Sequence, residues 1–195
     1  VLSDIDCIAI GWNPAINLSL KYQGKYSDRA RFAGDWLYSV PNQILSQLEQ
    51  ENSGPTIQEH LINGKKVQIH YVNHHDAHIA KAFLMSPFEE AAVFTADHYG
   101  EIATTTMKFA SNKGIQTIKE IEFPDSIGAL YAAFTEFLGY RAHRDEWKVM
   151  GMAAYGSSKR YEGKFNKIIN LTDNGDFELD LKYFSHFQFE KKGLF

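Results

Sequence analysis

The stretch VQIHYVNHHDAHIAKAFLM, residues 67–85, contains the junction that decides the fold class. Apolar and polar side chains alternate along its first part, which predicts a strand over residues 67–72. Residues 73–85 are predicted to form a helix that starts directly from this strand. Ligands of open α/β sheets gather at the carboxyl ends of strands, so the junction is also a favourable place for a functional site.

The sequence on both sides of this junction continues the mixture of strand and helix patterns. Asn63-Gly64 predicts a hairpin turn just before it. Further strands are predicted over residues 6–10, 91–96, 101–110, 115–123 and 177–181, and further helices over residues 32–51, 127–138, 147–155 and 162–171. The continuous apolar run over residues 91–96 predicts a buried strand. The chain is therefore predicted to be α/β, with a mixed sheet and an antiparallel meander flanked by helices.

Composition limits the class of protein further. The 195 residues are 44% hydrophobic and carry 20 Lys+Arg against 24 Asp+Glu, a net charge of −4. This excludes disordered, collagen-like and coiled-coil chains, and no apolar run approaches the roughly 18 residues that a membrane span needs. The mild acidity argues against a dominant nucleic-acid-binding surface. Cys7 is the only cysteine, which excludes a disulfide framework and a thiolate metal cage and predicts a cytoplasmic location.

Both ends of the chain predict a piece of a larger protein. The sequence opens at Val1 without an initiator Met or a signal-like segment, and an apolar strand follows within a few residues. The last residues are rich in Phe and stop without a polar tail. We expect residues 1–195 to be part of one domain, with no second domain in the chain.

Three histidines and an aspartate lie within NHHDAH, residues 73–78. His74 and His78 are four positions apart, so a helix projects both from one face, where they can hold one ion. Neutral imidazole is a ligand for zinc, iron, copper or nickel. The alternative is that one histidine caps the helix and the others are solvated. The pattern leaves both interpretations open.

The segment TADHYGE, residues 95–101, is a second candidate. Asp97 ends a predicted strand, Gly100 lets the backbone approach a phosphate, and Thr104 to Thr106 offer hydroxyl groups. The alternative is a plain hairpin with a turn stabilised by the side chain of Asp97, and spacing alone favours that alternative.

The segment RDEWKVMG, residues 144–151, is a third candidate. Glu146 and Lys148 lie at the start of a predicted helix, where they can bind a ribose or an anion. They are equally consistent with a solvated helix start, because acidic residues favour helix N-termini. Phosphate-loop, dinucleotide and nucleophile-elbow signatures are absent from the sequence.

Five segments together resemble the O-carbamoyltransferase family, whose members include nodulation-type and antibiotic-tailoring enzymes. They are NHHDAHIAKAF, SPFEEAAVFTADHYGE, ATTT, PDSIGALYAAFTEFLGY and EWKVMGMAAYG, which occur in the family's order. The resemblance extends over most of the chain, from Asp4 to Phe184. The tRNA threonylcarbamoyladenosine enzymes are similar too, but they have a serine-glycine-glycine loop where this chain has Asp97-His98-Tyr99-Gly100.

The resemblance implies a partial domain of the actin/sugar-kinase/Hsp70 (ribonuclease H-like) type. It implies that His74 and His78 bind a divalent transition metal, iron or alternatively zinc. By position, Asp97 matches the catalytic acidic residue of the adenylate and metal site, and Gly100 lies in the same loop. Glu146 and Lys148 match a charged pair of the family. A second domain of the same protein would make carbamoyl-adenylate from ATP and carbamoyl phosphate for transfer to an acceptor hydroxyl.

Two positions depart from the family pattern, since His98 replaces a glycine and Ala154 replaces a proline. The family's opening segment is expected before Val1. The second domain and a later aspartate that completes the metal ligands are expected beyond Phe195. We therefore expect this chain to show no transfer by itself. Two other functions stay open: a tRNA threonylcarbamoyladenosine-type transferase, and a non-catalytic binding module that keeps the fold.

Overall fold

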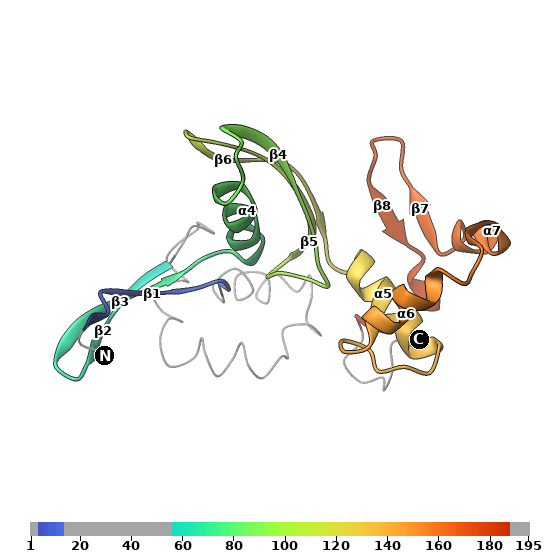
Figure 1. Ribbon diagram of the computed structural model, residues 1–195, viewed down its shortest axis with the longest axis horizontal. Helices are drawn as coiled ribbons and strands as arrows, with labels where there is room; N and C mark the ends of the chain where they lie inside the picture. The colour runs from blue at the N-terminus through green and yellow to red at the C-terminus, as the bar shows by residue number, and fades with distance from the viewer. Residues whose placement is uncertain (1–3, 14–55, 188–195) are drawn as a thin grey trace. The chain divides into compact units, whose positions relative to one another are not determined.

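The computed structural model describes residues 4–13 and 56–187 (Figure 1). The chain divides into two compact units. Unit 1 comprises Val1–Thr95, Gly100–Ile102 and Met107–Ile118, so far as these residues are described. Unit 2 comprises Ala96–Tyr99, Ala103–Thr106 and Lys119–Phe195, within the same limit. The helix predicted over residues 32–51 lies outside the described residues.

Unit 1 contains a three-stranded sheet of β1 (Cys7–Ile10), β2 (Thr56–Ile62) and β3 (Lys65–Tyr71), in the order β1-β3-β2. β1 runs parallel to β3, whereas β2 and β3 form an antiparallel hairpin. Positive φ angles of 51° at Asn63 and 81° at Gly64 suit the tight turn of such a hairpin. The predicted hairpin and mixed sheet are confirmed, and β2 is a strand that the sequence patterns had not indicated.

α4 (His74–Leu84) begins soon after β3, as predicted. Asn73 caps the helix, because its side chain accepts a hydrogen bond from the Asp76 backbone N–H at 3.0 Å. The helix packs through Ile79, which is fully buried against Val93 and Ala110. This packing attaches the body of α4 to the core of unit 1.

β4 (Glu90–Ala96), β5 (Ala103–Ser111) and β6 (Gly114–Glu122) form a second three-stranded sheet in chain order, and both units contain residues of it. The strand predicted over residues 91–96 is confirmed by β4, but the prediction that it is buried is wrong. Only Val93 of β4 is buried, and Phe94 is 60% exposed. Neighbouring side chains of a strand point to opposite faces, so packing against α4 covers one face alone.

Unit 2 is built around α5 (Ile127–Phe137). Ser126 caps this helix by accepting a hydrogen bond from the Ala129 backbone N–H at 3.0 Å, and Gly139, with a φ of 86°, follows its end. The core of the unit is a cluster of Ala133, Leu179 and Phe184. Both ends of α5 are therefore as the sequence predicts.

The predicted helix over residues 162–171 is wrong. The structure has a single turn, α7 (Glu162–Phe165), followed by the strand β7 (Ile169–Leu171), which pairs antiparallel with β8 (Phe177–Leu179). Ile169 packs against the Ala133 cluster from this strand. A β-branched residue that is held by tertiary packing and by a pairing strand outweighs the local helix preference.

α6 (Glu146–Ala153) is shorter than predicted, and none of its residues is buried. Its apolar side chains are exposed, with Trp147 and Met150 each at 64%. Short 3-10 turns at Ser158–Arg160 and Leu181–Tyr183 complete unit 2. Among the described residues, the helices all lack the length and apolar character that crossing a membrane requires.

Candidate metal centre

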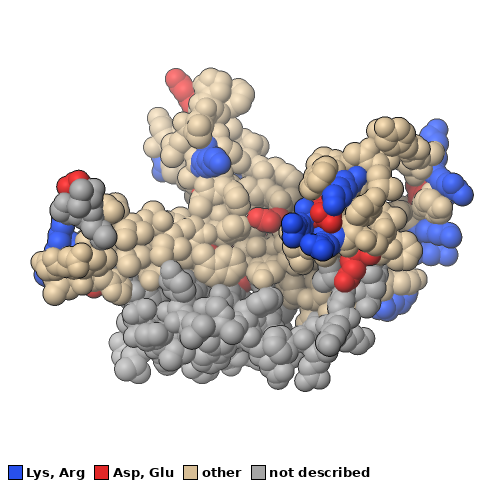
Figure 2. Space-filling model, turned by 60° about the horizontal axis from the view of Figure 1, so that its bottom comes forward, with Lys and Arg blue, Asp and Glu red and all other residues tan. Residues whose placement is uncertain are grey.

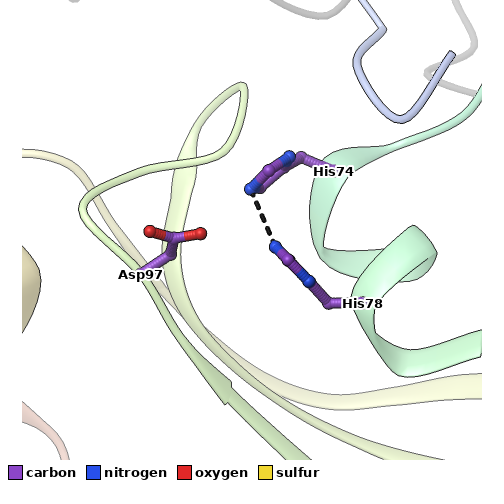
Figure 3. A group of neighbouring side chains, drawn as sticks. All are labelled: His74, His78 and Asp97. Atoms are coloured by element: carbon purple, nitrogen blue, oxygen red, sulfur yellow. Dashed lines mark hydrogen bonds between the residues drawn. The ribbon is translucent and has the colours of Figure 1, made fainter. Parts of the chain in front are cut away.

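The two histidines predicted as metal ligands lie one turn apart at the N-terminus of α4 (Figure 3). His74 Nε2 and His78 Nε2 are 3.1 Å apart, and the ring centroids are 4.5 Å apart. Two nitrogens bound to one zinc or iron ion at about 2.0–2.1 Å are separated by roughly 3.0–3.4 Å. The separation in the structure therefore matches two ligands of a single ion.

The imidazole of His74 is oriented by a backbone carbonyl group that is 63 residues away in the chain. Its Nδ1 atom lies 3.1 Å from the carbonyl oxygen of Gly11, which follows β1. A carbonyl oxygen can only accept, so Nδ1 carries the proton and Nε2 presents its lone pair to His78. A proton on His78 Nε2 completes the hydrogen bond between the rings, and a metal ion can take that proton's place.

Asp97 follows β4 directly in the chain. Its carboxylate and the side-chain nitrogens of His74 and His78 provide ligand atoms that all lie within 4.8 Å of one another (Figure 3). The carboxylate also accepts the His98 backbone N–H at 2.7 Å, a local bond of the kind aspartate makes in turns. Two imidazoles and a carboxylate are a donor set typical of iron(II) and zinc.

The third histidine of the cluster, His75, belongs to the core. Its ring is fully buried, and Nδ1 lies 2.8 Å from Thr95 Oγ1. A Cβ added to Gly100 would meet His75 Cδ2 at 2.7 Å, so a side chain at this position would collide with the ring. The backbone of Gly100 therefore approaches the side chains of α4 closely. The predicted contact between Gly100 and a phosphate stays a prediction.

Glu101 is a buried residue of this region that the sequence analysis missed. Its carboxylate Oε1 accepts the backbone N–H groups of Asn13 at 2.6 Å and His74 at 3.0 Å. Burial raises the pKa of Glu101, and these N–H donors oppose the shift because they stabilise the carboxylate. A single glutamate gives no periodic signal, and its partners lie 88 and 27 residues away.

His98, which departs from the family pattern, packs within unit 2. Its ring lies against that of His143, with centroids 4.7 Å apart. Burial, followed by the charges of His143 and His186, lowers the pKa of His98 to about 4. The backbone of His98 lies so close to Gly128 that an added Cβ there would meet His98 N at 2.5 Å. His98 is therefore held against the start of α5.

Glu146 and Lys148 contact residues close to them in the chain. The Glu146 carboxylate accepts the His143 backbone N–H, and Lys148 Nζ lies 3.0 Å from Asp145 Oδ1. Lys148 Nζ is also 5.5 Å from the ring centroid of Trp147. These contacts suit a half-solvated helix start, and the predicted contacts with a nucleotide stay a prediction.

Basic side chains gather on part of the surface in the view of Figure 2. Residues 139–167 of unit 2 contain seven basic and three acidic side chains, although the whole chain has a net charge of −4. The exposed basic residues of this segment are Arg141, Arg144, Lys159, Arg160, Lys164 and Lys167. Their positive charge favours anions over this part of unit 2.

Known proteins place the chain in a family. The family described as carbamoyltransferase N-terminus matches residues 10–193. The chain is 34% identical to the nodulation protein NolNO of Sinorhizobium fredii, over 58% of the chain and 17% of that protein. It is 34% identical to the nodulation protein NolO of Bradyrhizobium diazoefficiens, over 56% of the chain and 20% of that protein.

A protein of Synechocystis sp., the uncharacterized protein sll1178, is 40% identical over 58% of the chain and 18% of its own length. The matched part of the chain thus spans about a fifth of these relatives. Because the family match extends over nearly all of the sequence, the resemblance seen in its motifs is confirmed. The chain belongs to the carbamoyltransferase N-terminus family.

Proposed function

We propose that this chain is the metal-binding part of an enzyme that transfers a carbamoyl group to the hydroxyl group of a small-molecule acceptor. The observation that carries the proposal is the pair of Nε2 atoms of His74 and His78, 3.1 Å apart, in a chain of the carbamoyltransferase N-terminus family. Iron is the metal that we propose first and zinc the alternative, with Asp97 as a third, anionic ligand. A bound metal ion would act as a Lewis acid toward the carbonyl oxygen of the carbamoyl group.

The proposed donor is carbamoyl-adenylate, made in a second domain from carbamoyl phosphate, water and ATP with release of phosphate and pyrophosphate. The acceptor hydroxyl oxygen attacks the carbamoyl carbon and forms the new C–O bond. The bond from that carbon to the adenylate phosphate oxygen breaks, AMP leaves with the electron pair, and the hydroxyl proton passes to water. His74 presents a fixed Nε2 lone pair beside Nε2 of His78, whose proton a metal ion would replace, and this supports the role of both residues as ligands.

We further propose that Gly100, Glu146 and Lys148 contribute to binding the adenylate. The resemblance to the family supports these roles, and the excess of basic side chains over residues 139–167 agrees with an anionic ligand. The proposed domain type is that of actin, sugar kinases and Hsp70, of which the observed mixed α/β arrangement is a coarser description.

The test uses the complete protein and compares wild type with His78→Ala. Wild type should contain stoichiometric iron or zinc by elemental analysis, and His78→Ala should lose most of it. His70→Ala is the matched control, because His70 lies on β3 and bonds Gln68, two residues away in the chain. The control should keep its metal.

The same proteins are then supplied with ATP, carbamoyl phosphate and glycerol, a simple hydroxyl compound that serves as the acceptor. In His78→Ala, pyrophosphate release should persist, because adenylate formation belongs to the other domain, while AMP release by transfer should fall. Unchanged metal and unchanged AMP release in His78→Ala would contradict the proposal. Ligand binding without any AMP release by wild type would favour the non-catalytic binding module. Residues 1–195 alone should release no AMP.

A further inference from the structure

The buried carboxylate of Glu101 holds two segments of unit 1 together at the candidate metal centre. The residue is 0% exposed and follows Gly100 in the connection between β4 and β5. Its Oε1 accepts the N–H of Asn13 at 2.6 Å, and both of its oxygens accept the N–H of His74, at 3.0 and 3.1 Å. One side chain therefore bridges the segment after β1 and the first residue of α4.

A helix cap alone does not explain this arrangement. Asn73 already caps α4 through the Asp76 N–H, so Glu101 serves a different donor, the N–H of His74. Withdrawing a carboxylate from water is costly unless several hydrogen bonds compensate for it. Helix N-termini favour anions, and the Asn13 N–H adds a second donor. One of the hydrogen bonds that compensate for burying the Glu101 carboxylate therefore comes from the backbone N–H of His74, a proposed metal ligand.

The two segments that Glu101 bridges also meet at the imidazole of His74. Gly11 accepts from His74 Nδ1 at 3.1 Å, and Asn13, two residues later, donates its N–H to Glu101. Glu101 thus holds the backbone of His74 directly. Through Asn13 it also holds the segment that contains Gly11, whose carbonyl oxygen orients the His74 ring. Loss of the carboxylate would loosen both attachments together.

We infer that Glu101 is a positioning residue for the metal centre, which fixes the backbone and the ring orientation of His74 so that Nε2 faces His78. The inference rests on the proposed role of His74 and His78 as metal ligands. Partners that orient metal-ligating histidines typically contribute about 10- to 100-fold to metal affinity. Glu101 acts through His74 and is not itself a ligand.

The experiment measures Co²⁺ binding to the complete protein by the visible absorption of the bound ion. Glu101→Ala should weaken Co²⁺ affinity at least about 10-fold and change the absorption band, because the first ligand is no longer held. Glu101→Gln should stay within about threefold of wild type, because one amide oxygen can accept both N–H groups. Rescue by glutamine separates the hydrogen bonds from the negative charge.

Ile79→Ala is the matched control for lost stability. Ile79 is a fully buried residue of the same helix and packs in the core against Val93 and Ala110. Its truncation should lower the melting temperature and leave the Co²⁺ affinity of the folded protein unchanged. If Glu101→Ala fails to fold, Glu101→Asp replaces it, because the shorter side chain keeps the charge and cannot bridge Asn13 and His74 together.

A second readout needs no metal. In ¹⁵N spectra of the imidazoles, wild type should show His74 as the Nδ1–H tautomer, and Glu101→Ala should show a mixture of tautomers. Wild-type Co²⁺ affinity in Glu101→Ala, or an equal loss in Ile79→Ala, would overturn the inference. If His78→Ala loses Co²⁺ while Glu101→Ala keeps it, only the positioning role fails. If wild type binds no Co²⁺, the metal centre itself fails as well.

Discussion

The N-termini of α4 and α6 both carry residues predicted to bind a ligand, and they differ in how they are held. At each of them an aspartate pairs with a lysine, which is Lys108 of β5 at α4 and Lys148 of the helix itself at α6. At α4, the partners of the first residue come from far along the chain, and Glu101 among them is completely buried. At α6, the side chains of Glu146 and Lys148 bond residues three positions away, Tyr131 of α5 donates its hydroxyl to the Glu146 carbonyl oxygen at 2.9 Å, and the helix has no buried residue.

The distance along the chain between contacting residues determines where a preorganised site can form. Contacts within three or four residues form and break with the helix itself, so they add little rigidity. Contacts that join segments 27 to 88 residues apart form only when the whole unit is folded. Of these two helix starts, that of α4 is therefore the more rigid and suits chemistry that needs fixed geometry, and that of α6 is more adaptable.

The largest expected effect tests the α4 side of this comparison. Asp97→Asn in the complete protein should keep the local turn bond, because asparagine accepts the same backbone N–H. It should nevertheless reduce carbamoyl transfer about 10²-fold or more, because a preorganised negative charge is removed. Transfer is measured as AMP release, with circular dichroism as the control for folding. Near wild-type transfer would make Asp97 a turn residue and nothing more.

The next effect concerns the segment before α6, where His143 lies against His98. Burial and the neighbouring histidines lower the pKa of His98 to about 4, and burial lowers the pKa of His186 as well. In the unfolded chain a histidine has a pKa of about 6.5. The unfolded state therefore binds more protons between these values, and stability rises with pH across that range.

Stability should accordingly be complete above about pH 6.5 and decline as the pH falls toward 4. For His98, allowing for partial solvent exposure, the expected loss is on the order of 2 kcal/mol. Urea unfolding of the metal-free protein at pH 7 and pH 4.5 measures it, with His98→Gln as the comparison. Equal pH dependence in wild type and His98→Gln would show that this histidine is not the source.

The smallest effects compare two lysine–aspartate pairs. Lys108 Nζ lies 2.7 Å from Asp76 of α4 with 6% of its side chain exposed, and Lys148 Nζ lies 3.0 Å from Asp145 before α6 with 39% exposed. Lys108→Gln should cost about 1–3 kcal/mol, because it removes the buried partner of a half-exposed aspartate. Lys148→Gln should cost less than about 0.5 kcal/mol. Both are measured by urea unfolding, and equal losses would remove the distinction between the two helix starts.

The local features of the fold were predictable from the sequence. Ser126 and Gly139 mark the two ends of α5 because caps act within one turn of the chain, and the structure has both there, whereas Asn73, which lies inside the predicted helix 73–85, is the cap of α4. The i, i+4 spacing of His74 and His78 places them together on any helix, whatever surrounds it. Family membership also followed from the order of the motifs and is confirmed.

Features that depend on contacts between distant residues could not be predicted from the sequence and became visible only in the tertiary structure. It buried His75 and left the apolar side chains of α6 exposed, because burial depends on what packs against a residue. It placed Ile169 in the strand β7, because pairing with β8 and packing against the Ala133 cluster stabilise that strand. It also brought Glu101 to Asn13 and His74, since a hydrogen bond between residues far apart in the chain leaves no periodic trace in either segment.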